Sequence, residues 1–282
     1  MEVKKVGIIL RKNSEEPKVI AEELRVWFAE REIDTVIDQV SEDLDLLVIL
    51  GGDGTLLQVA EQASSFAIPV VGINLGDLGF LTEVASSERL EALDAILSGG
   101  LQYENRMMLK VRLCSDGCES EWFHALNDVV ITKGDIDQLI RLGAWADQDY
   151  ITTYRADGLI FSTPTGATAY NLSAGGPIVH PNLNSILVTP ICPFMLDSRP
   201  VLLSPETKLT TRLVGGSGNV KVIIDGKVIW DMRENDVLEV RSADKPLQLI
   251  GSPQKDYFEI LRNKLNWGGS ERVRSKEPVG KL

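Results

Sequence analysis

An aspartate enclosed by glycines stands in the stretch VILGGDGTLLQVA, residues 48–60, where an apolar run gives way to a helical pattern. Glycine allows a sharp turn there and lets a ligand approach the backbone without interference from a Cβ atom. The N–H groups at the start of the following helix favour a phosphate. A carboxylate is costly beside a polyanion, so Asp53 indicates a group that takes a proton from a hydroxyl or helps to hold a phosphate-bound metal ion.

The same turn also has a purely structural interpretation, because Asp often caps a helix through its side chain. The doubled glycine before Asp53 favours the functional interpretation. The turn is not a Walker loop, since no GxxxxGK[ST] pattern occurs, and a complete GxGxxG fingerprint is absent as well. We therefore assign Asp53 to catalysis and predict a phosphate loop made by Gly51, Gly52, Gly54 and Thr55.

A second stretch rich in possible ligand groups reads RADGLIFSTPTGATAYNLSAGG at residues 155–176. It contains another Asp-Gly pair at Asp157, a strand-like run at 159–161, and a hydroxyl-rich turn that leads into a short helix near Thr168. Hydroxyls and helix-terminal N–H groups suit a ligand with many oxygen atoms, and Tyr170 offers a ring on which a base could stack. Pro-Thr-Gly as an ordinary turn and Tyr170 as a core residue form the weaker alternative.

The periodicity of apolar residues predicts the elements that position these turns. Apolar runs predict strands at residues 6–10, 35–37, 46–50 and 68–73. Helical spacing predicts helices at residues 20–28, 55–63 and 90–97. The alternation of strands and helices is typical of a parallel sheet covered on both sides, and the glycine turn at Asp53 then lies at the carboxyl end of a strand, where ligands of such sheets collect.

After residue 100 short alternating runs replace this rhythm and predict a β-rich, sandwich-like domain. The runs lie at residues 110–114, 121–124, 129–132, 150–154, 158–162, 185–189, 208–214, 220–224 and 237–241. We expect an α/β domain at 1–100, to which a C-terminal helix at about 252–267 returns, and a β-rich domain at 101–251. The tail at 268–282 has little apolar content and is expected to be disordered.

Composition narrows the class of protein. The 282 residues carry a formal net charge of −12, which disfavours broad contact with nucleic acid or an anionic membrane surface. No apolar stretch approaches the ~20 residues of a membrane span, and no signal-peptide pattern opens the chain, so we expect a cytoplasmic protein. The three cysteines form no CxxC pair, which favours reduced thiols over a structural zinc site.

Taken together, the motifs resemble those of the ATP-NAD kinase family. The matching stretches follow the family order and cover nearly the whole chain: GGDGT (51–55), NLGDLGFLTE (74–83), LNDVVI (126–131), RADGLIFSTPTGATAYNLSAGGPIVHP (155–181), PICPF (190–194), SRPVLL (198–203) and LRNKLNW (261–267). GGDGT is shared with diacylglycerol and sphingosine kinases and, with Ser for Thr, with 6-phosphofructokinases. The TPTGATAYN stretch is far more specific.

The resemblance implies a phosphofructokinase-like first domain and an NAD-binding second domain. It implies transfer of the ATP γ-phosphate to the adenosine-ribose 2′-hydroxyl of NAD, giving NADP, with Mg²⁺ or another divalent cation. Asp53 would accept the proton, and no metal ligands are assigned. By similarity, the residues expected to line the NAD site are Asp53, Gly54, Phe80, Asn127, Asp128, Arg155, Asp157, Thr168, Ala169, Tyr170, Asn171, Ser173, Asp225 and Lys227.

Three positions depart from the usual family pattern: Asp128 replaces Glu, Phe194 replaces His, and Gln58 replaces Arg. No phosphate contact is therefore assigned to position 58. No Lys or Arg lies inside the GGDGT turn, so Arg155 or a second subunit is expected to help neutralise the triphosphate. Family members form dimers or tetramers, and an exposed apolar strand at 220–224 would be compatible with such an assembly.

Two alternatives remain open at this stage. A lipid kinase of the diacylglycerol type shares the GGDGT motif and a β-rich second domain, although the acidic charge and the absence of a basic amphipathic face speak against it. A catalytically silent dinucleotide-binding module, with Asp53 only a helix cap, is the other.

Overall fold

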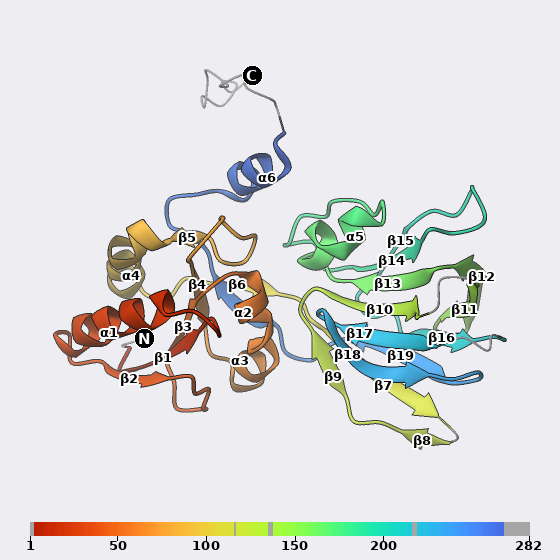
Figure 1. The fold of residues 1–282 in the computed structure, drawn as a ribbon, viewed down its shortest axis with the longest axis horizontal. Helices are drawn as coiled ribbons and strands as arrows, with labels where there is room; N and C mark the ends of the chain where they lie inside the picture. Colours follow the sequence, from red (N-terminus) through yellow and green to blue (C-terminus); the bar gives the residue numbers. More distant parts are fainter. Residues whose placement is uncertain (1–2, 116, 135–137, 216–218, 268–282) are drawn as a thin grey trace.

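A computed structural model describes residues 3–115, 117–134, 138–215 and 219–267, arranged as two domains side by side (Figure 1). The predicted tail at 268–282 lies outside the described residues. No helix in the described part of the chain is both long and apolar enough to cross a membrane.

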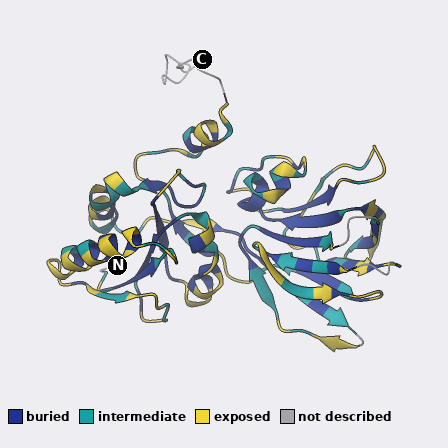
Figure 2. Ribbon diagram, in the orientation of Figure 1, coloured by how far each residue is buried: buried dark blue, intermediate teal, exposed yellow. Residues whose placement is uncertain are grey.

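The first domain is built on a mainly parallel sheet with the strand order β2-β1-β3-β4-β20-β6, in which β5 also pairs with β4. Its strands are β1 (Lys5–Leu10), β2 (Asp34–Ile37), β3 (Leu46–Leu50), β4 (Val70–Asn74), β5 (Val84–Ala85), β6 (Glu104–Arg106) and β20 (Leu247–Ile250). Every residue of β3 and β4 is buried, as expected for strands covered on both faces. Figure 2 shows these strands as the buried centre of the domain.

Helices cover both faces of this sheet. On one face, α1 (Glu16–Ala29) and α4 (Arg89–Ser98), which follows a short 3₁₀ turn η1 (Ser86–Glu88), pack Leu24, Phe28 and Leu93 into a common core. On the other face lie α2 (Asp53–Leu57) and α3 (Ala60–Phe66). The core beneath them includes Met108 and Leu126, so this face also contacts the second domain.

The helix predicted at 55–63 is in fact two short helices. The break falls at Val59, a β-branched residue whose φ of −117° and ψ of −1° end the helical path. Both segments still bury side chains in one core, Leu56 from α2 and Ala60 from α3. The break therefore redirects the chain without exposing apolar surface.

The second domain is a sandwich of two antiparallel sheets. One sheet has the order β15-β14-β13-β10-β17-β18, and the other has the order β12-β11-β16-β19-β7-β8 with β9 also paired to β7. The first comprises β10 (Asp128–Lys133), β13 (Gly158–Ser162), β14 (Ile186–Ile191), β15 (Val201–Leu203), β17 (Val220–Ile224) and β18 (Lys227–Met232). The second comprises β7 (Leu109–Ser115), β8 (Cys118–Glu119), β9 (Phe123–Ala125), β11 (Ile140–Ala146), β12 (Asp149–Ala156), β16 (Leu209–Leu213) and β19 (Val237–Ser242).

A 3₁₀ turn, η2 (Gly166–Thr168), and a one-turn helix, α5 (Tyr170–Ser173), interrupt the strands close to where the short helix was predicted. The last helix, α6 (Tyr257–Leu265), follows β20 and lies near the junction of the two domains (Figure 1). Asp256 caps it by accepting a hydrogen bond from the Glu259 N–H at 2.8 Å. The ring of Tyr257 meets that of His180, from the second domain, with centroids 4.7 Å apart.

Three expectations need correction. The second-domain strands β8, β11, β15 and β18 were missed, and the run expected at 121–124 becomes a strand only from Phe123. β6 and β20 lie in the region expected to form the second domain, yet they hydrogen-bond in the first sheet. The strand at 220–224 is not an exposed apolar surface, because its apolar side chains Val220, Val222 and Ile224 point into the sandwich core.

Candidate active site

Asp53 begins α2 at the carboxyl end of β3, as the sequence predicted. Its Oδ1 accepts hydrogen bonds from the N–H of Leu81 (3.1 Å), the N–H of Thr82 (3.0 Å) and the Thr82 hydroxyl (3.0 Å). Its Oδ2 accepts one, from the Phe80 N–H at 2.9 Å. Among the described residues, the hydrogen bonds of this carboxylate all come from residues 80–82 and none from its own helix, so the helix-cap interpretation does not describe its contacts. Asp53 instead connects the glycine turn to the loop after β4.

That loop is shaped to receive the carboxylate. A Cβ atom at Gly79 would lie 2.0 Å from Asp53 Oδ1, so only glycine permits this approach. The Asn74 amide at the end of β4 donates to the Thr82 hydroxyl at 2.8 Å, and its carbonyl oxygen accepts from the Gly76 N–H at 2.7 Å. The end of β4 therefore fixes both the loop and, through Thr82, the orientation of Asp53.

The glycines of the turn serve different purposes. A Cβ atom at Gly51 would come within 2.4 Å of the Thr55 hydroxyl oxygen, so internal packing requires glycine there. At Gly52 and Gly54 a Cβ atom would meet nothing within 4 Å, and neither residue has a positive φ. Protein packing and backbone strain therefore do not explain these two glycines, whereas close approach of a ligand would.

The second domain contributes a paired set of carboxylates. Asp225, in the turn between β17 and β18, accepts hydrogen bonds from the N–H groups of Leu126 (2.7 Å), Asn127 (2.9 Å) and Asp128 (3.0 Å). This turn fixes the segment that carries Asn127 and Asp128. Lys227, which is exposed, is near enough to Asp225 to lower the pKa of that carboxyl and so favour its ionised form.

Asp128 is buried, and its pKa is strongly perturbed. Burial, followed by repulsion from Asp225, raises the pKa of Asp128 to about 7, and a hydrogen bond from the Tyr170 backbone opposes the rise. Burial also raises the pKa of Asp225, but its three backbone donors favour the charged form. Asp128 is therefore the member of the pair that takes up a proton near neutrality.

The hydroxyl-rich turn is tied to the same segment. The Thr163 hydroxyl donates to the Leu126 carbonyl at 2.6 Å and accepts from the Gly166 N–H at 3.0 Å. The Thr163 N–H donates to the Asn127 carbonyl at 2.9 Å. These bonds hold the start of α5 beside Asn127, and the Tyr170 ring projects from it with 44% of its surface exposed.

Asn171 and its neighbours divide into buried and open positions. The Asn171 side chain is fully buried, donates to the Ala167 and Pro177 carbonyls, and accepts from the Thr189 hydroxyl. It stabilises the turn from inside. By contrast, Thr168 and Ala169 are half-buried and Ser173 is exposed.

The two domains meet at this point. A narrow cleft between them is lined from the first domain by Phe80, Leu81 and Arg106, and from the second by Thr165 and Thr168, with α6 adding Tyr257. The structure therefore brings Asp53, the Phe80 loop, Asn127, Asp128 and the turn at 163–173 together across one junction.

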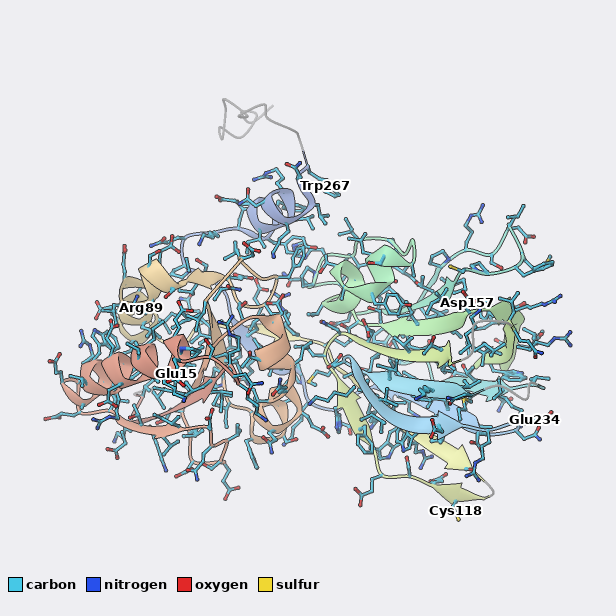
Figure 3. All side chains as sticks on the ribbon, in the orientation of Figure 1. Glu15, Arg89, Cys118, Asp157, Glu234 and Trp267 are labelled. Atoms are coloured by element: carbon cyan, nitrogen blue, oxygen red, sulfur yellow. The ribbon has the colours of Figure 1, made fainter. Side chains whose placement is uncertain are left out.

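Arg155 and Asp157 lie elsewhere. In the pairing of β10 with β13, Asp128 is opposite Ser162, whereas Thr132 is opposite Gly158. Asp157 forms an ion pair with Lys133 at 2.6 Å, about 17 Å along the strand from Asp128 at ~3.4 Å per residue. Arg155 lies over the Phe194 ring, 4.6 Å from its centroid. Figure 3 shows Asp157 at the outer end of the second domain.

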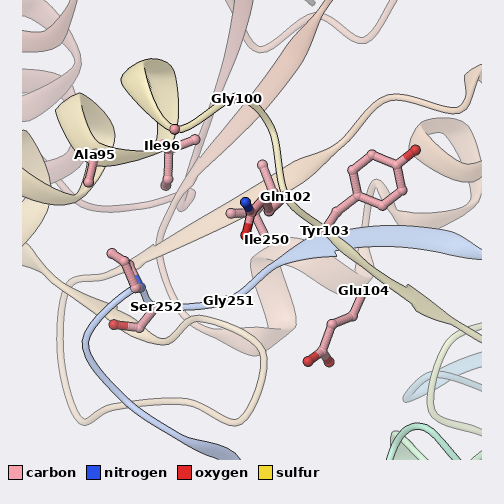
Figure 4. Close-up of a pocket in the computed structure, with 11 residues that line it drawn as sticks. Ala95, Ile96, Gly100, Gln102, Tyr103, Glu104, Ile250, Gly251 and Ser252 are labelled. Carbon is pink, nitrogen blue, oxygen red and sulfur yellow. The ribbon is translucent and has the colours of Figure 1, made fainter.

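A separate groove of about 420 Å³ lies where α4 ends beside β6 and the end of β20 (Figure 4). Its lining includes Ile96, Tyr103, Glu104, Ile250 and Ser252. None of the predicted site residues lines it.

Several residues around Asp53 were not predicted from the sequence. Gly79 and Thr82 shape the contact with Asp53, and Arg11 follows β1 directly beside Gly51. The signal for Arg11 was available, because neighbouring parallel strands end at the same edge of a sheet. The signal for Gly79 and Thr82 was not, because it depends on how the loop folds back.

Family models match both domains: the ATP-NAD kinase N-terminal domain over residues 4–101 and the ATP-NAD kinase C-terminal domain over residues 126–252. The chain belongs to the ATP-NAD kinase family. Among its relatives, an NAD kinase of Geotalea daltonii is 40% identical, with 94% of this chain and 99% of the relative covered. An NAD kinase of Heliobacterium modesticaldum is 42% identical, with 93% and 99% covered.

Solved structures of an NADH kinase and of an NAD kinase share the fold. Yeast NADH kinase complexed with NADH superposes with a TM-score of 0.86 at 26% identity, covering 98% of this chain and 91% of that chain. An NAD kinase from Archaeoglobus fulgidus in complex with ATP gives a TM-score of 0.74 at 22% identity, covering 93% and 98%. The predicted α/β domain and β-sandwich are thereby confirmed as the ATP-NAD kinase architecture, and nothing supports the lipid-kinase alternative.

Proposed function

We propose that this chain is an NAD kinase that transfers the γ-phosphate of ATP to the adenosine-ribose 2′-hydroxyl of NAD, giving NADP. The observation that carries the proposal is the placement of Asp53. Its carboxylate lies at the carboxyl edge of the sheet, beside the open backbone of Gly52 and Gly54 and bound to the Phe80 loop at the domain junction.

A ribose hydroxyl is a weak nucleophile, and a carboxylate within hydrogen-bond reach can orient it and take its proton as the phosphoryl group transfers. Oδ1 of Asp53 is occupied by three donors, whereas Oδ2 accepts only one hydrogen bond from the described residues. In this proposal Oδ2 is the atom that accepts the proton. The loop amides hold the carboxylate in place for that step.

The remaining NAD contacts are proposed from the same junction. Asn127 and Asp128 would hydrogen-bond sugar hydroxyls, Phe80 and Tyr170 would pack on the dinucleotide, and the exposed face from Thr168 to Ser173 would line its ends. A protonated Asp128 can donate to a sugar oxygen, and an ionised one can accept from a hydroxyl. Asn171 supports this face from inside, because its polar atoms are already bonded to the protein.

Arg155 and Asp157 could reach a dinucleotide bound at Asp53 only with difficulty, since they lie at the far end of β13. If both contact NAD, a second copy of the chain must supply them. We therefore propose a homodimer or homotetramer in which each site is completed by a neighbour. The cytoplasmic location remains a prediction from the sequence.

The residues available as metal ligands also bear on how a divalent cation would be bound. In the described residues no cluster of three or more His, Cys, Asp and Glu could hold a metal ion by itself. This suits Mg²⁺, which is commonly bound by one or two carboxylates together with substrate phosphates. Asp53 is the carboxylate inside the predicted phosphate loop, and a bound cation would neutralise part of the triphosphate charge.

The test is to incubate the purified protein with ATP and Mg²⁺ and either NAD or a diacylglycerol. We expect NADP from the first mixture and no phosphorylated lipid from the second. Phosphorylation of the lipid without formation of NADP would overturn the assignment. If neither product forms, the chain would be a binding module without kinase activity.

A further inference from the structure

Arg11 lies against the predicted phosphate loop. β1 and β3 are parallel neighbours with Leu10 opposite Leu50, and the Arg11 N–H continues the ladder by donating to the Leu50 carbonyl at 2.9 Å. Arg11 therefore stands beside Gly51, where a Cβ atom would lie only 3.1 Å from the Arg11 Cβ. The side chain starts directly next to the backbone that is open at Gly52 and Gly54.

The guanidinium is held only loosely by the protein. Its Nη2 is 3.4 Å from the Ser14 hydroxyl oxygen and 3.8 Å from Glu16 Oε2, and 41% of the side chain is exposed. A good bond between charged groups is about 2.7–2.9 Å long. Arg25 on α1, by comparison, makes two bonds of 2.9 and 2.6 Å to Glu22. Arg11 can therefore turn toward an anion and break only these two long contacts.

The charge balance of the site calls for such a cation. Asp53, Asp128 and Asp225 are carboxylates, and Glu83 is another, near enough to Asp53 for the two charges to repel. A nucleotide triphosphate adds several more negative charges, which a kinase site must neutralise. The GGDGT turn contains no Lys or Arg.

The sheet order decides which substrate Arg11 would contact. β1 and β4 flank β3 on opposite sides, and the Phe80 loop, which borders the second domain, follows β4 (Figure 1). Arg11 therefore lies on the side of Asp53 away from the proposed dinucleotide contacts. In an in-line transfer the donor approaches from the side opposite the acceptor hydroxyl.

We propose that Arg11 binds the triphosphate of the nucleotide donor and positions it at the GGDGT turn. The proposal rests on the proposed function and adds to it a residue that determines donor affinity. A guanidinium can engage phosphate oxygens through two parallel hydrogen bonds, which a lysine ammonium cannot reproduce.

The experiment compares Arg11→Gln and Arg11→Lys with the wild type in steady-state formation of NADP, varying ATP and NAD separately. We expect Arg11→Gln to raise the KM for ATP about 10- to 100-fold, the loss typical of a hydrogen bond to a charged group. The KM for NAD should stay within about twofold, as follows from the separation of the two sides. Arg11→Lys should give an intermediate KM for ATP.

Lys18→Gln is the matched control, because Lys18 is an exposed cation near the start of α1 whose ammonium pairs with Glu15 at 2.7 Å. It removes the same charge and should leave both KM values unchanged. Titration of each variant with a non-hydrolysable ATP analogue, followed by calorimetry, measures donor binding apart from turnover. Thermal unfolding checks that each variant is folded.

The outcomes separate the two proposals. A wild type that makes no NADP overturns the proposed function, whatever the variants do. An active wild type with an unchanged ATP affinity in Arg11→Gln overturns the role of Arg11 and leaves the kinase intact. A rise in the KM for NAD alone would overturn the assignment to the donor side. If Arg11→Gln does not fold, an unchanged ATP affinity in Arg11→Lys overturns the proposal in its place.

Discussion

Replacing Asp53 by Asn tests the central carboxylate and can be worked through from its contacts. The asparagine carbonyl can keep the donors now on Oδ1, but its NH₂ group must then face the Phe80 N–H, which is also a donor. One bond is lost and three change from charged to neutral. At about 1.5–3 kcal/mol for a charged hydrogen bond and 0.5–1.5 for a neutral one, the lost bond and the three weakened bonds add up to about 4.5–7.5 kcal/mol, which is the upper limit of the local stability that the loop loses.

The loss of catalysis is a separate effect from this local loss of stability. Removing a general base typically costs about 10²- to 10⁴-fold in rate, so the kcat of Asp53→Asn should fall at least about 100-fold while the protein stays folded. The assay is initial-rate formation of NADP at saturating ATP and NAD, with thermal unfolding on the same samples.

Thr82→Val separates the proton transfer from the loop. It removes one donor to Asp53 and the acceptor of the Asn74 amide, and it leaves the carboxylate in place. It should therefore loosen the loop but reduce kcat by less than about tenfold, because only one of the two lost hydrogen bonds reaches Asp53. Two results would refute the reasoning: a folded Asp53→Asn that keeps more than a tenth of the wild-type kcat, or a Thr82→Val variant as inactive as Asp53→Asn.

Three further predictions follow from neighbouring features. Gly54→Ala should leave the free energy of unfolding unchanged or raise it by up to about 1 kcal/mol, since alanine is the better helix former and meets no protein atom there; NADP formation should nevertheless fall sharply, and full activity in a kinetic assay would show that no ligand needs that space. Because the pKa of Asp128 is raised from 3.8 to about 7, the folded state binds its proton more tightly than the unfolded state, so stability should fall as pH rises from about 4 to about 7, by up to about 4 kcal/mol. Urea unfolding at pH 5 and pH 8 should show that the free energy of unfolding decreases less between these pH values in Asp128→Asn than in the wild type. Asp157→Asn, which changes a half-exposed ion pair, should show the same decrease as the wild type. If neighbouring subunits complete each site, mixing inactive Asp53→Asn with inactive Asp157→Asn should restore part of the activity. No recovery after confirmed subunit exchange would mean either that one chain supplies both residues to its site or that Asp157 does not belong to the site.

Much of this architecture could be predicted because its signals are local. The apolar run of β3, the glycine turn and the helix after it lie within about fifteen residues, and they fixed Asp53 at the sheet edge correctly. The short helix at Tyr170 likewise follows from its own turn.

The rest depends on pairings between residues far apart in the chain. β6 and β20 are separated by about 140 residues and still join one sheet, which no local pattern indicates. Arg155 and Asp157 lie next to the TPTG turn in sequence, yet an extended strand carries them to the opposite end of the sandwich. The strand at 220–224 looked exposed only because its partners were unknown.

The pairing of β6 with β20 has a consequence for how the molecule can be taken apart. Arg106 and Leu247 are opposite each other in this antiparallel pair, so the chain departs from the first domain and re-enters it about 5 Å away. Residues 107–246 thus form an inserted segment whose two ends lie next to each other in the first domain. A short hairpin between Arg106 and Leu247 could therefore close the first sheet in place of the inserted segment. The same two positions are where the segment could be exchanged for that of a relative.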